Sequence, residues 1–70
     1  MKVRYDKEVD AADVQLSSKR PKGAIEIKEG VVVHVANKDE IVGIEILDAS
    51  HRFPIRNLHN LQFVKTVPGT

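Results

Sequence analysis

The sequence has 70 residues, of which 41% are apolar and 30% are charged. This composition excludes a disordered chain and predicts one small domain. A domain of this size has only a thin core, which favours self-association. The lack of cysteine excludes disulfides and thiolate metal sites, and with a charged start and no long apolar run it favours a cytoplasmic protein without a membrane span. A net charge of +1 and a pI near 8.1 argue against the broad basic surface of a general nucleic-acid binder.

Alternating apolar and polar residues predict the first three strands. Val3 and Tyr5 alternate with charged residues over 2–5, and the same two-residue period recurs over 12–16 and 24–28. A period of two places successive side chains on opposite sides of a strand, so each segment would have one apolar side.

The segment 17–23 has the Ser, Pro and Gly content of an exposed loop. Its Lys19, Arg20 and Lys22 are the candidate residues for contact with phosphate groups. A solvated loop is the stronger interpretation, because proteins that bind single strands combine a basic groove with several aromatic side chains, and aromatic residues are few here.

Two β-branched runs at 31–36 and 40–47 flank a polar turn and predict a central β-hairpin. One side of this hairpin would bury alternating valine and isoleucine side chains. The other side is partly apolar too, with Val32, Ile41 and Leu47. These three residues need a cover, either the C-terminal segment or another subunit, and are the predicted partner or dimer contacts.

The residues after the hairpin allow two interpretations. Pro54 suits a first helical turn, and the apolar spacing that follows it predicts a short helix at about 54–62, whereas the apolar residues from Leu61 onward could equally form a sixth strand. The predicted fold is therefore α+β and β-rich, an antiparallel sheet of about five strands with a short C-terminal helix or sixth strand. Residues 1–67 would form one domain and 68–70 a loose tail.

The sequence contains no recognisable catalytic, cofactor-binding or metal-binding motif. The three histidines, His34, His51 and His59, lack a close ligand-type spacing. Asp48, Ser50 and His51 have the residue types of a hydrolytic triad but are near neighbours in one corner, where bonds from Asp48 and Ser50 to backbone amides are the favoured interpretation.

An acidic run near the start of the chain could supply oxygen ligands to a divalent cation. A solvated turn with mixed charge pairs is favoured instead, because basic residues lie alongside it and the glycine and final glutamate of an EF-hand loop are missing. The run consists of Asp6, Glu8, Asp10 and Asp13.

Several short segments resemble a family of small prokaryotic proteins catalogued as domain of unknown function 2283. The residues that carry the likeness are Tyr5-Asp6-Lys7-Glu8, Asp10-Ala11, Leu16-Ser17, Gly30-Val31 and Val42-Gly43-Ile44-Glu45-Ile46-Leu47-Asp48-Ala49-Ser50. The chain departs from the family pattern at Asp13, where an aromatic residue is usual, and at His34-Val35-Ala36, where the family is more acidic. The resemblance implies the same β-rich fold and no established activity. Because its members match small toxin–antitoxin components in size, it also implies the hypothesis of an antitoxin-like role.

The favoured function is a non-enzymatic small binding or interaction module that forms a homodimer and engages a protein partner, with an antitoxin-like component as one form of it. The alternative is a nucleic-acid-binding regulator that uses the loop Lys19 to Lys22. A small hydrolase or metal enzyme is the least favoured hypothesis. No cofactor is predicted.

Overall fold

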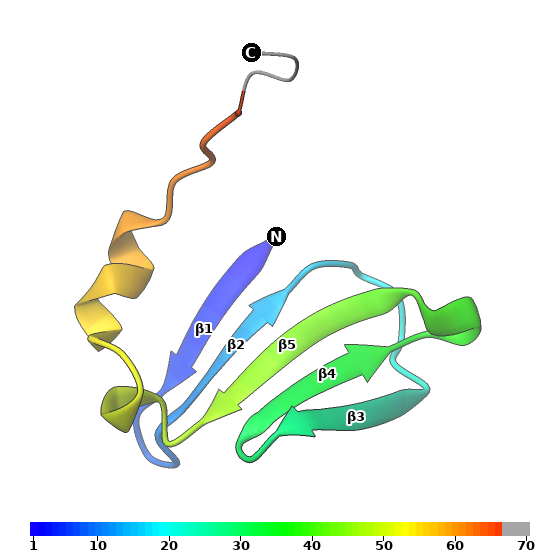
Figure 1. The fold of residues 1–70 in the computed structure, drawn as a ribbon, viewed down its shortest axis with the longest axis horizontal. Coiled ribbons are helices and arrows are strands. Elements are labelled where there is room, and N and C mark those ends of the chain that lie inside the picture. Colours follow the sequence, from blue (N-terminus) through cyan, green and yellow to red (C-terminus); the bar gives the residue numbers. More distant parts are fainter. Residues whose placement is uncertain (67–70) are drawn as a thin grey trace.

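The sheet of antiparallel strands predicted from the sequence is present in the computed structural model, which describes residues 1–66 (Figure 1). Every strand begins and ends within one residue of its predicted bounds, because the two-residue period of apolar side chains follows the pleat directly. The strands are β1 (Lys2–Asp6), β2 (Ala11–Gln15), β3 (Gly23–Lys28), β4 (Val31–Val35) and β5 (Ile41–Leu47).

The strand order is β1-β2-β5-β4-β3, so the last strand of the sequence lies in the middle of the sheet (Figure 1). After β2 the chain crosses to the far edge, forms the β3–β4 hairpin there, and returns as β5 between β4 and β2. Gly43 permits this insertion, because a Cβ at that position would lie only 2.8 Å from the carbonyl oxygen of Val14. The central strand thus depends on a residue without a side chain.

The turns between strands use left-handed backbone conformations. Gly30 has a φ of 80° between β3 and β4, and Asp10 has a φ of 52° between β1 and β2. The predicted polar turn before β5 contains the single-turn 3₁₀ helix η1 (Asn37–Asp39), in which Lys38 and Asp39 have φ of 59° and 60°. Polar residues tolerate this region better than β-branched ones, which explains where the valine runs stop.

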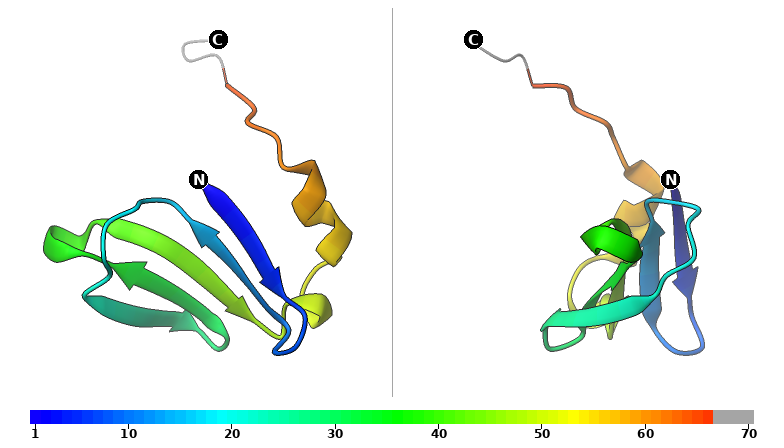
Figure 2. Two further views of the ribbon diagram at one scale, coloured as in Figure 1. Left: turned by 180° about the vertical axis from the view of Figure 1, so that it is seen from behind. Right: turned by 90° about the vertical axis from the view of Figure 1, so that its right-hand side faces the viewer.

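The sheet is a single twisted layer, and its core is thin (Figure 2). Among the described residues, the buried apolar side chains are Ala12, Val42 and Ala49, and no large side chain is fully buried. A stable domain normally packs two layers of secondary structure around its core. Residues 1–66 place no second layer over the sheet.

The C-terminal part departs from both predicted forms. After the corner helix η2 (Ala49–His51), residues Ile55–Asn60 form the 3₁₀ helix η3 instead of an α-helix, and no sixth strand is present up to residue 66. The three-residue spacing of the half-buried Ile55 and Leu58 fits the 3₁₀ repeat, and a short segment with so little burial gains too little to hold an α-helix. Residue 67 and the predicted tail 68–70 lie outside the described residues.

Helix η3 lies beside β1, at one edge of the sheet and not across it (Figures 1 and 2). Ile55, Leu58 and His59 line a shallow pocket together with Val3 and Tyr5. None of the helices described up to residue 66 is long and apolar enough to cross a membrane.

Candidate interaction surface

One side of the sheet carries a continuous row of aliphatic side chains. The strand register aligns Val3 with Val14, Val14 with Ile44, Ile44 with Val33 and Val33 with Ile25, so one row crosses all five strands. The neighbouring row on the same side aligns Tyr5, Ala12, Ile46 and Val31. We call these nine residues the apolar face.

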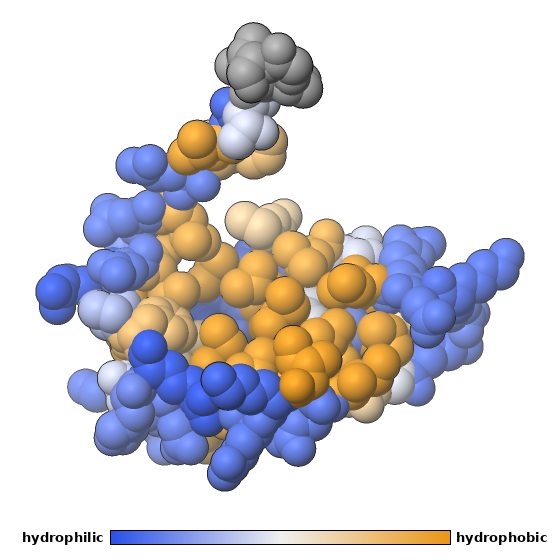
Figure 3. All heavy atoms as spheres, in the orientation of Figure 1, coloured by the Kyte–Doolittle hydropathy of each residue, from blue (hydrophilic) through white to orange (hydrophobic). Residues whose placement is uncertain are grey.

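The apolar face is only partly covered. Figure 3 shows apolar atoms gathered over the sheet, with hydrophilic side chains around their margin. Most of the face is half-buried by neighbouring side chains alone, and Ile25 on the edge strand is 51% exposed. A patch of this extent is uncommon on a monomer and is typical of a surface that binds another molecule.

The opposite side of the sheet is polar. Its central row aligns Arg4, Asp13, Glu45, Val32 and Glu26 across the five strands. Nη1 of Arg4 lies 3.2 Å from Oδ2 of Asp13. Exposed pairs of this kind contribute at most about 1 kcal/mol each to stability, but their charges keep this side in water.

A histidine on the polar side adds to the same pattern. Nε2 of His34 lies 3.4 Å from Oε1 of Glu45, on the neighbouring strand. His34 is one of the residues at which the sequence departs from the resembled family. Its place on the polar side leaves the apolar face unaffected.

The three residues predicted to contact a partner are not brought together. Val32 lies in the polar row between Glu45 and Glu26 and is half-buried there. Ile41 and Leu47, 49% and 39% exposed, stand at opposite ends of β5, roughly 20 Å apart at the rise of a strand. Because the register shifts before it, Ile41 is aligned with Val35, on the same side as Val31 and Val33, whereas Val32 and Leu47 lie on the polar side. A role for these three residues in binding stays a prediction.

Asp10 holds the corner where the chain leaves β5. Its carboxylate accepts hydrogen bonds from the Tyr5 hydroxyl at 2.7 Å, the Ser50 hydroxyl at 2.7 Å and the Ser50 backbone N–H at 3.0 Å. The hydrogen bonds from Tyr5 and then Ser50 lower the pKa of Asp10 from 3.8 to about 2, and the bond to Asp10 raises the pKa of the Tyr5 hydroxyl. We call these residues the Asp10 cluster.

The Asp10 cluster does not have the arrangement of a hydrolytic triad. In a triad the imidazole accepts the proton of the serine hydroxyl, whereas here that hydroxyl donates directly to a carboxylate. His51 Nδ1 lies further off, 3.4 Å from the Ser50 hydroxyl and 3.5 Å from Asp10 Oδ2. The predicted bonds from the side chains of Asp48 and Ser50 to backbone amides are not found: the Ser50 hydroxyl donates to Asp10, and the side chain of Asp48 makes no capping bond. The backbone N–H of Ser50 is instead bound by the carboxylate of Asp10.

Arg52 fastens the same corner to the β3–β4 turn. Its guanidinium donates from Nε to the carbonyl of Leu47 and from Nη2 to the carbonyl of Glu29, each at 2.9 Å. The guanidinium passes directly over Gly30, where any Cβ would collide with it. Sequence reasoning missed Arg52, since nothing in the local sequence indicates a partner 23 positions away.

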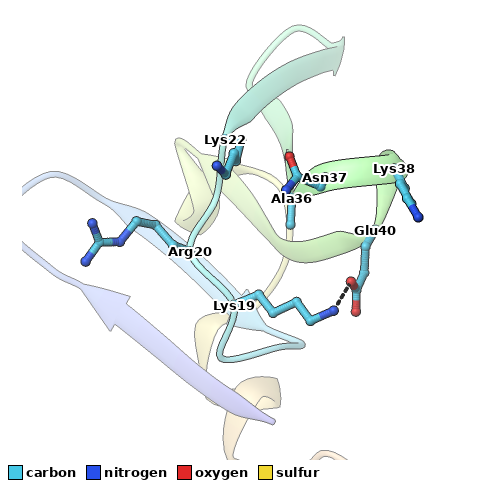
Figure 4. A pocket seen from close by; sticks show the side chains of 7 residues that line it. All are labelled: Lys19, Arg20, Lys22, Ala36, Asn37, Lys38 and Glu40. Atoms are coloured by element: carbon cyan, nitrogen blue, oxygen red, sulfur yellow. Dashed lines mark hydrogen bonds and ion pairs between the residues drawn. The ribbon is translucent and has the colours of Figure 1, made fainter.

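The loop between β2 and β3 contributes to a basic pocket at the other end of the sheet. The pocket, of about 550 Å³, is lined by Lys19, Arg20, Lys22, Ala36, Asn37, Lys38 and Glu40. Nζ of Lys19 lies 2.5 Å from Oε1 of Glu40. Figure 4 shows the side chains of Arg20 and Lys38 pointing away from each other, so the predicted phosphate contacts gain Lys38 as a neighbour but do not converge on one point.

The carboxylates of the early acidic run have separate surroundings. Asp6 Oδ1 accepts the backbone N–H of Glu8 at 3.0 Å, Asp13 pairs with Arg4, and Asp10 belongs to the cluster described above. Within residues 1–66, no group of three or more His, Cys, Asp or Glu side chains has an arrangement that could hold a metal ion.

Comparison with known proteins gives a family and a partial relative. The chain is 34% identical over 64 residues to a putative hypoxanthine phosphoribosyltransferase from Methanosarcina mazei, an alignment that covers 89% of this chain and 51% of that protein. The chain thus spans about half the length of this relative. No solved structure matches it. The family described as Protein of unknown function (DUF2283) matches residues 2–50, a segment that contains all five strands and ends at Ser50 of the Asp10 cluster. The chain therefore belongs to the DUF2283 family, as the resemblance of its sequence segments indicated.

Proposed function

We propose that this protein is a non-enzymatic interaction module that binds a protein partner through the apolar face. The observation that carries the proposal is the row from Val3 to Ile25, which crosses every strand of a single-layer sheet and has no second layer over it in residues 1–66. Burial of apolar surface yields roughly 25 cal/mol per Å², so a face of this kind favours association with a complementary surface.

The proposal includes two more specific expectations. A cytoplasmic setting follows from the cysteine-free sequence, because small secreted domains usually rely on disulfides. An antitoxin-like role would be one use of the same surface, with a toxin as the bound protein. Neither expectation changes which residues should carry the binding.

A capture experiment with matched variants tests which side of the sheet binds. Ile25→Lys places a charge on the apolar face, and Ala24→Lys places the same charge on the adjacent, exposed position of β3 that faces the other way. The full chain and both variants would be immobilised and exposed to the native organism's lysate and to the purified protein itself.

The proposal expects at least one bound protein, which can be a second copy of the chain, to be retained by the wild type and Ala24→Lys and lost by Ile25→Lys. Circular dichroism would show that Ile25→Lys keeps its strands. If all three proteins retain the same set of binders, the apolar face is not the binding surface.

The basic pocket supports a second candidate function, the nucleic-acid-binding regulator. The supporting observation is that Lys38 of the β4–β5 turn joins Lys19, Arg20 and Lys22 around one pocket. Affinity for a fluorescent oligonucleotide should then fall steeply with salt and decrease when these four residues are replaced by alanine.

Because the name of the Methanosarcina mazei relative implies a phosphoribosyl substrate for that protein, a phosphoribosyl compound is a second probe for the pocket. Unchanged binding after the alanine replacements, or none at low salt, would remove this candidate.

A further inference from the structure

We infer that a second copy of this chain occupies the apolar face, so that two sheets pack face to face as a symmetric two-layer β-sandwich. This inference rests on the proposed function and names its first partner. In the part of the chain that the structure describes, the sheet is one layer, and a second, identical sheet would supply the other.

The surface area of the single chain supports a partner of this size. The chain exposes 5879 Å². A compact folded monomer of 7.8 kDa would expose roughly 4,400 Å², so about 1,500 Å² is in excess. Part of the excess belongs to residues 61–66, which lead away from the sheet. A standard interface buries roughly 800 Å² on each partner, which the remainder and the open apolar face can supply.

The chemistry of the apolar face favours a copy of itself over a different partner. Its nine residues are uncharged, and the one charged residue aligned with them is Lys28, at the outer end of the row that contains Val31. A symmetric interface places the same patch on both partners, so a patch rich in charges of one sign would repel its copy, whereas an aliphatic patch does not. The net charge of +1 per chain adds little long-range repulsion.

The strand order makes the match geometrically simple. β5 is the middle strand of the sheet, and Ile44 is the middle member of the row from Val3 to Ile25. A twofold axis close to Ile44 would therefore place all five strands of one sheet opposite those of the other. Aligned sheets pack about 10 Å apart with interlocking side chains, and β-branched residues suit that spacing.

Helix η3 and residues 61–66 would lie at the margin of this interface. Helix η3 stands at the β1 edge of the apolar face, with Ile55 and Leu58 beside Val3 and Tyr5. The segment that follows leads away from its own sheet and exposes Leu61 by 54%, Phe63 by 93% and Val64 by 74%. In the dimer these apolar side chains would lie next to the partner's sheet at its margin.

The test measures the mass and the unfolding of the full chain over a range of protein concentrations. Sedimentation equilibrium should give twice 7.8 kDa at micromolar concentration. The thermal midpoint should rise with protein concentration, as it does when folding is coupled to association. Ile25→Lys should weaken the dimer by about 100-fold or more, because each substitution occurs twice in a symmetric dimer, and Ala24→Lys should leave it unchanged.

Two results would overturn the inference. The first is a mass of 7.8 kDa together with a midpoint that does not depend on concentration. The second is a dimer weakened by Ala24→Lys and not by Ile25→Lys, which would place the interface on the polar side. The mass and the thermal midpoint of the wild type still test the inference if Ile25→Lys fails to fold. If the protein is a monomer but lysate capture still depends on Ile25, the proposed function stands with another protein as occupant; if capture is also unaffected, both fail.

Discussion

The carboxylate of Asp10 connects two segments that are 40 positions apart in the sequence. It accepts three hydrogen bonds, and these join the β1–β2 turn to Ser50 at the exit of β5. The same two segments, Asp10-Ala11 and the run ending at Ser50, carry much of the likeness to the DUF2283 family. Their contact gives a physical reason why residues so distant in sequence belong to one pattern.

Ionisation of Asp10 should make the fold sensitive to acid. Its pKa is lowered from 3.8 to about 2, first by the Tyr5 hydroxyl and then by the Ser50 hydroxyl. A carboxyl group with a lowered pKa in the folded state contributes stability that is complete above its unfolded pKa and is lost as the pH falls through its folded pKa. The urea midpoint of the wild type should therefore decrease between about pH 4 and pH 2.

Two variants test this assignment. Asp10→Asn should be less stable than the wild type near neutral pH and should show a smaller decrease in midpoint over the acid range. Ser50→Ala keeps the hydrogen bond from Tyr5, so its stability and its acid-induced decrease in midpoint should lie between those of the wild type and Asp10→Asn. An acid profile of Asp10→Asn that superimposes on that of the wild type would show that another group causes the acid sensitivity.

Two glycines with different surroundings should respond oppositely to alanine. A Cβ at Gly43 would meet the backbone oxygen of Val14 at 2.8 Å, and backbone in the middle of a sheet cannot move away, so Gly43→Ala should cost about 1–3 kcal/mol of unfolding free energy. At Gly23 the nearest atom would be Cγ2 of the Val35 side chain, at 3.8 Å. Gly23→Ala should be neutral or stabilising by up to about 1 kcal/mol. Chemical denaturation measures both, and equal losses would contradict the close approach of β2 and β5.

Among the elements, the strands were predictable and the C-terminal helix was not. In β1, Val3 and Tyr5 alternate with charged residues, and this two-residue period describes a strand whatever its neighbours are. By contrast, the spacing of Ile55 and Leu58 fits an α-helix and a 3₁₀ helix equally. What decides between them is how much surface the segment buries, and that is set by its position beside β1, which the local sequence does not contain.

The candidate surface was predictable only in part for the same reason. Alternation in the hairpin separates Val31 and Val33 from Val32, so the existence of an apolar side follows from the sequence. Which side stays open depends on where η3 and residues 61–66 lie. Because they stand at the β1 edge, the side expected to be the core is the one left open.

Differences in burial between elements should appear as differences in local stability. Amides of β5 are paired on both sides, to β2 and β4, whereas η3 has no buried residue. Hydrogen exchange followed by mass spectrometry should therefore show fast exchange in residues 55–66 and slow exchange in β5. Equal protection in both regions of the isolated wild type would mean that η3 packs more tightly than its exposed side chains indicate.

At the scale of the whole molecule, the two sides of one sheet serve different purposes. The polar side places charges of both signs in water, as in the row from Arg4 to Glu26, which keeps it from associating with other apolar surfaces. The apolar side would be a liability on an isolated chain and becomes a core once another sheet covers it. Binding a partner then stabilises the folded state, so the fraction of folded protein should rise with the partner's concentration.

Adjacent valines on β4 offer a direct test of this coupling. Val32 and Val33 are both half-buried in the single chain, on opposite sides of the sheet, and Val→Thr keeps the shape of the side chain while adding a hydroxyl. If the chain stays single, the two substitutions should cost similar amounts. If a second layer covers the apolar face, Val33→Thr buries a hydroxyl without a partner and should cost about 1–3 kcal/mol, while Val32→Thr should stay within about 0.5 kcal/mol of the wild type. Urea denaturation at one fixed protein concentration measures both, and equal losses would show that Val33 remains in water.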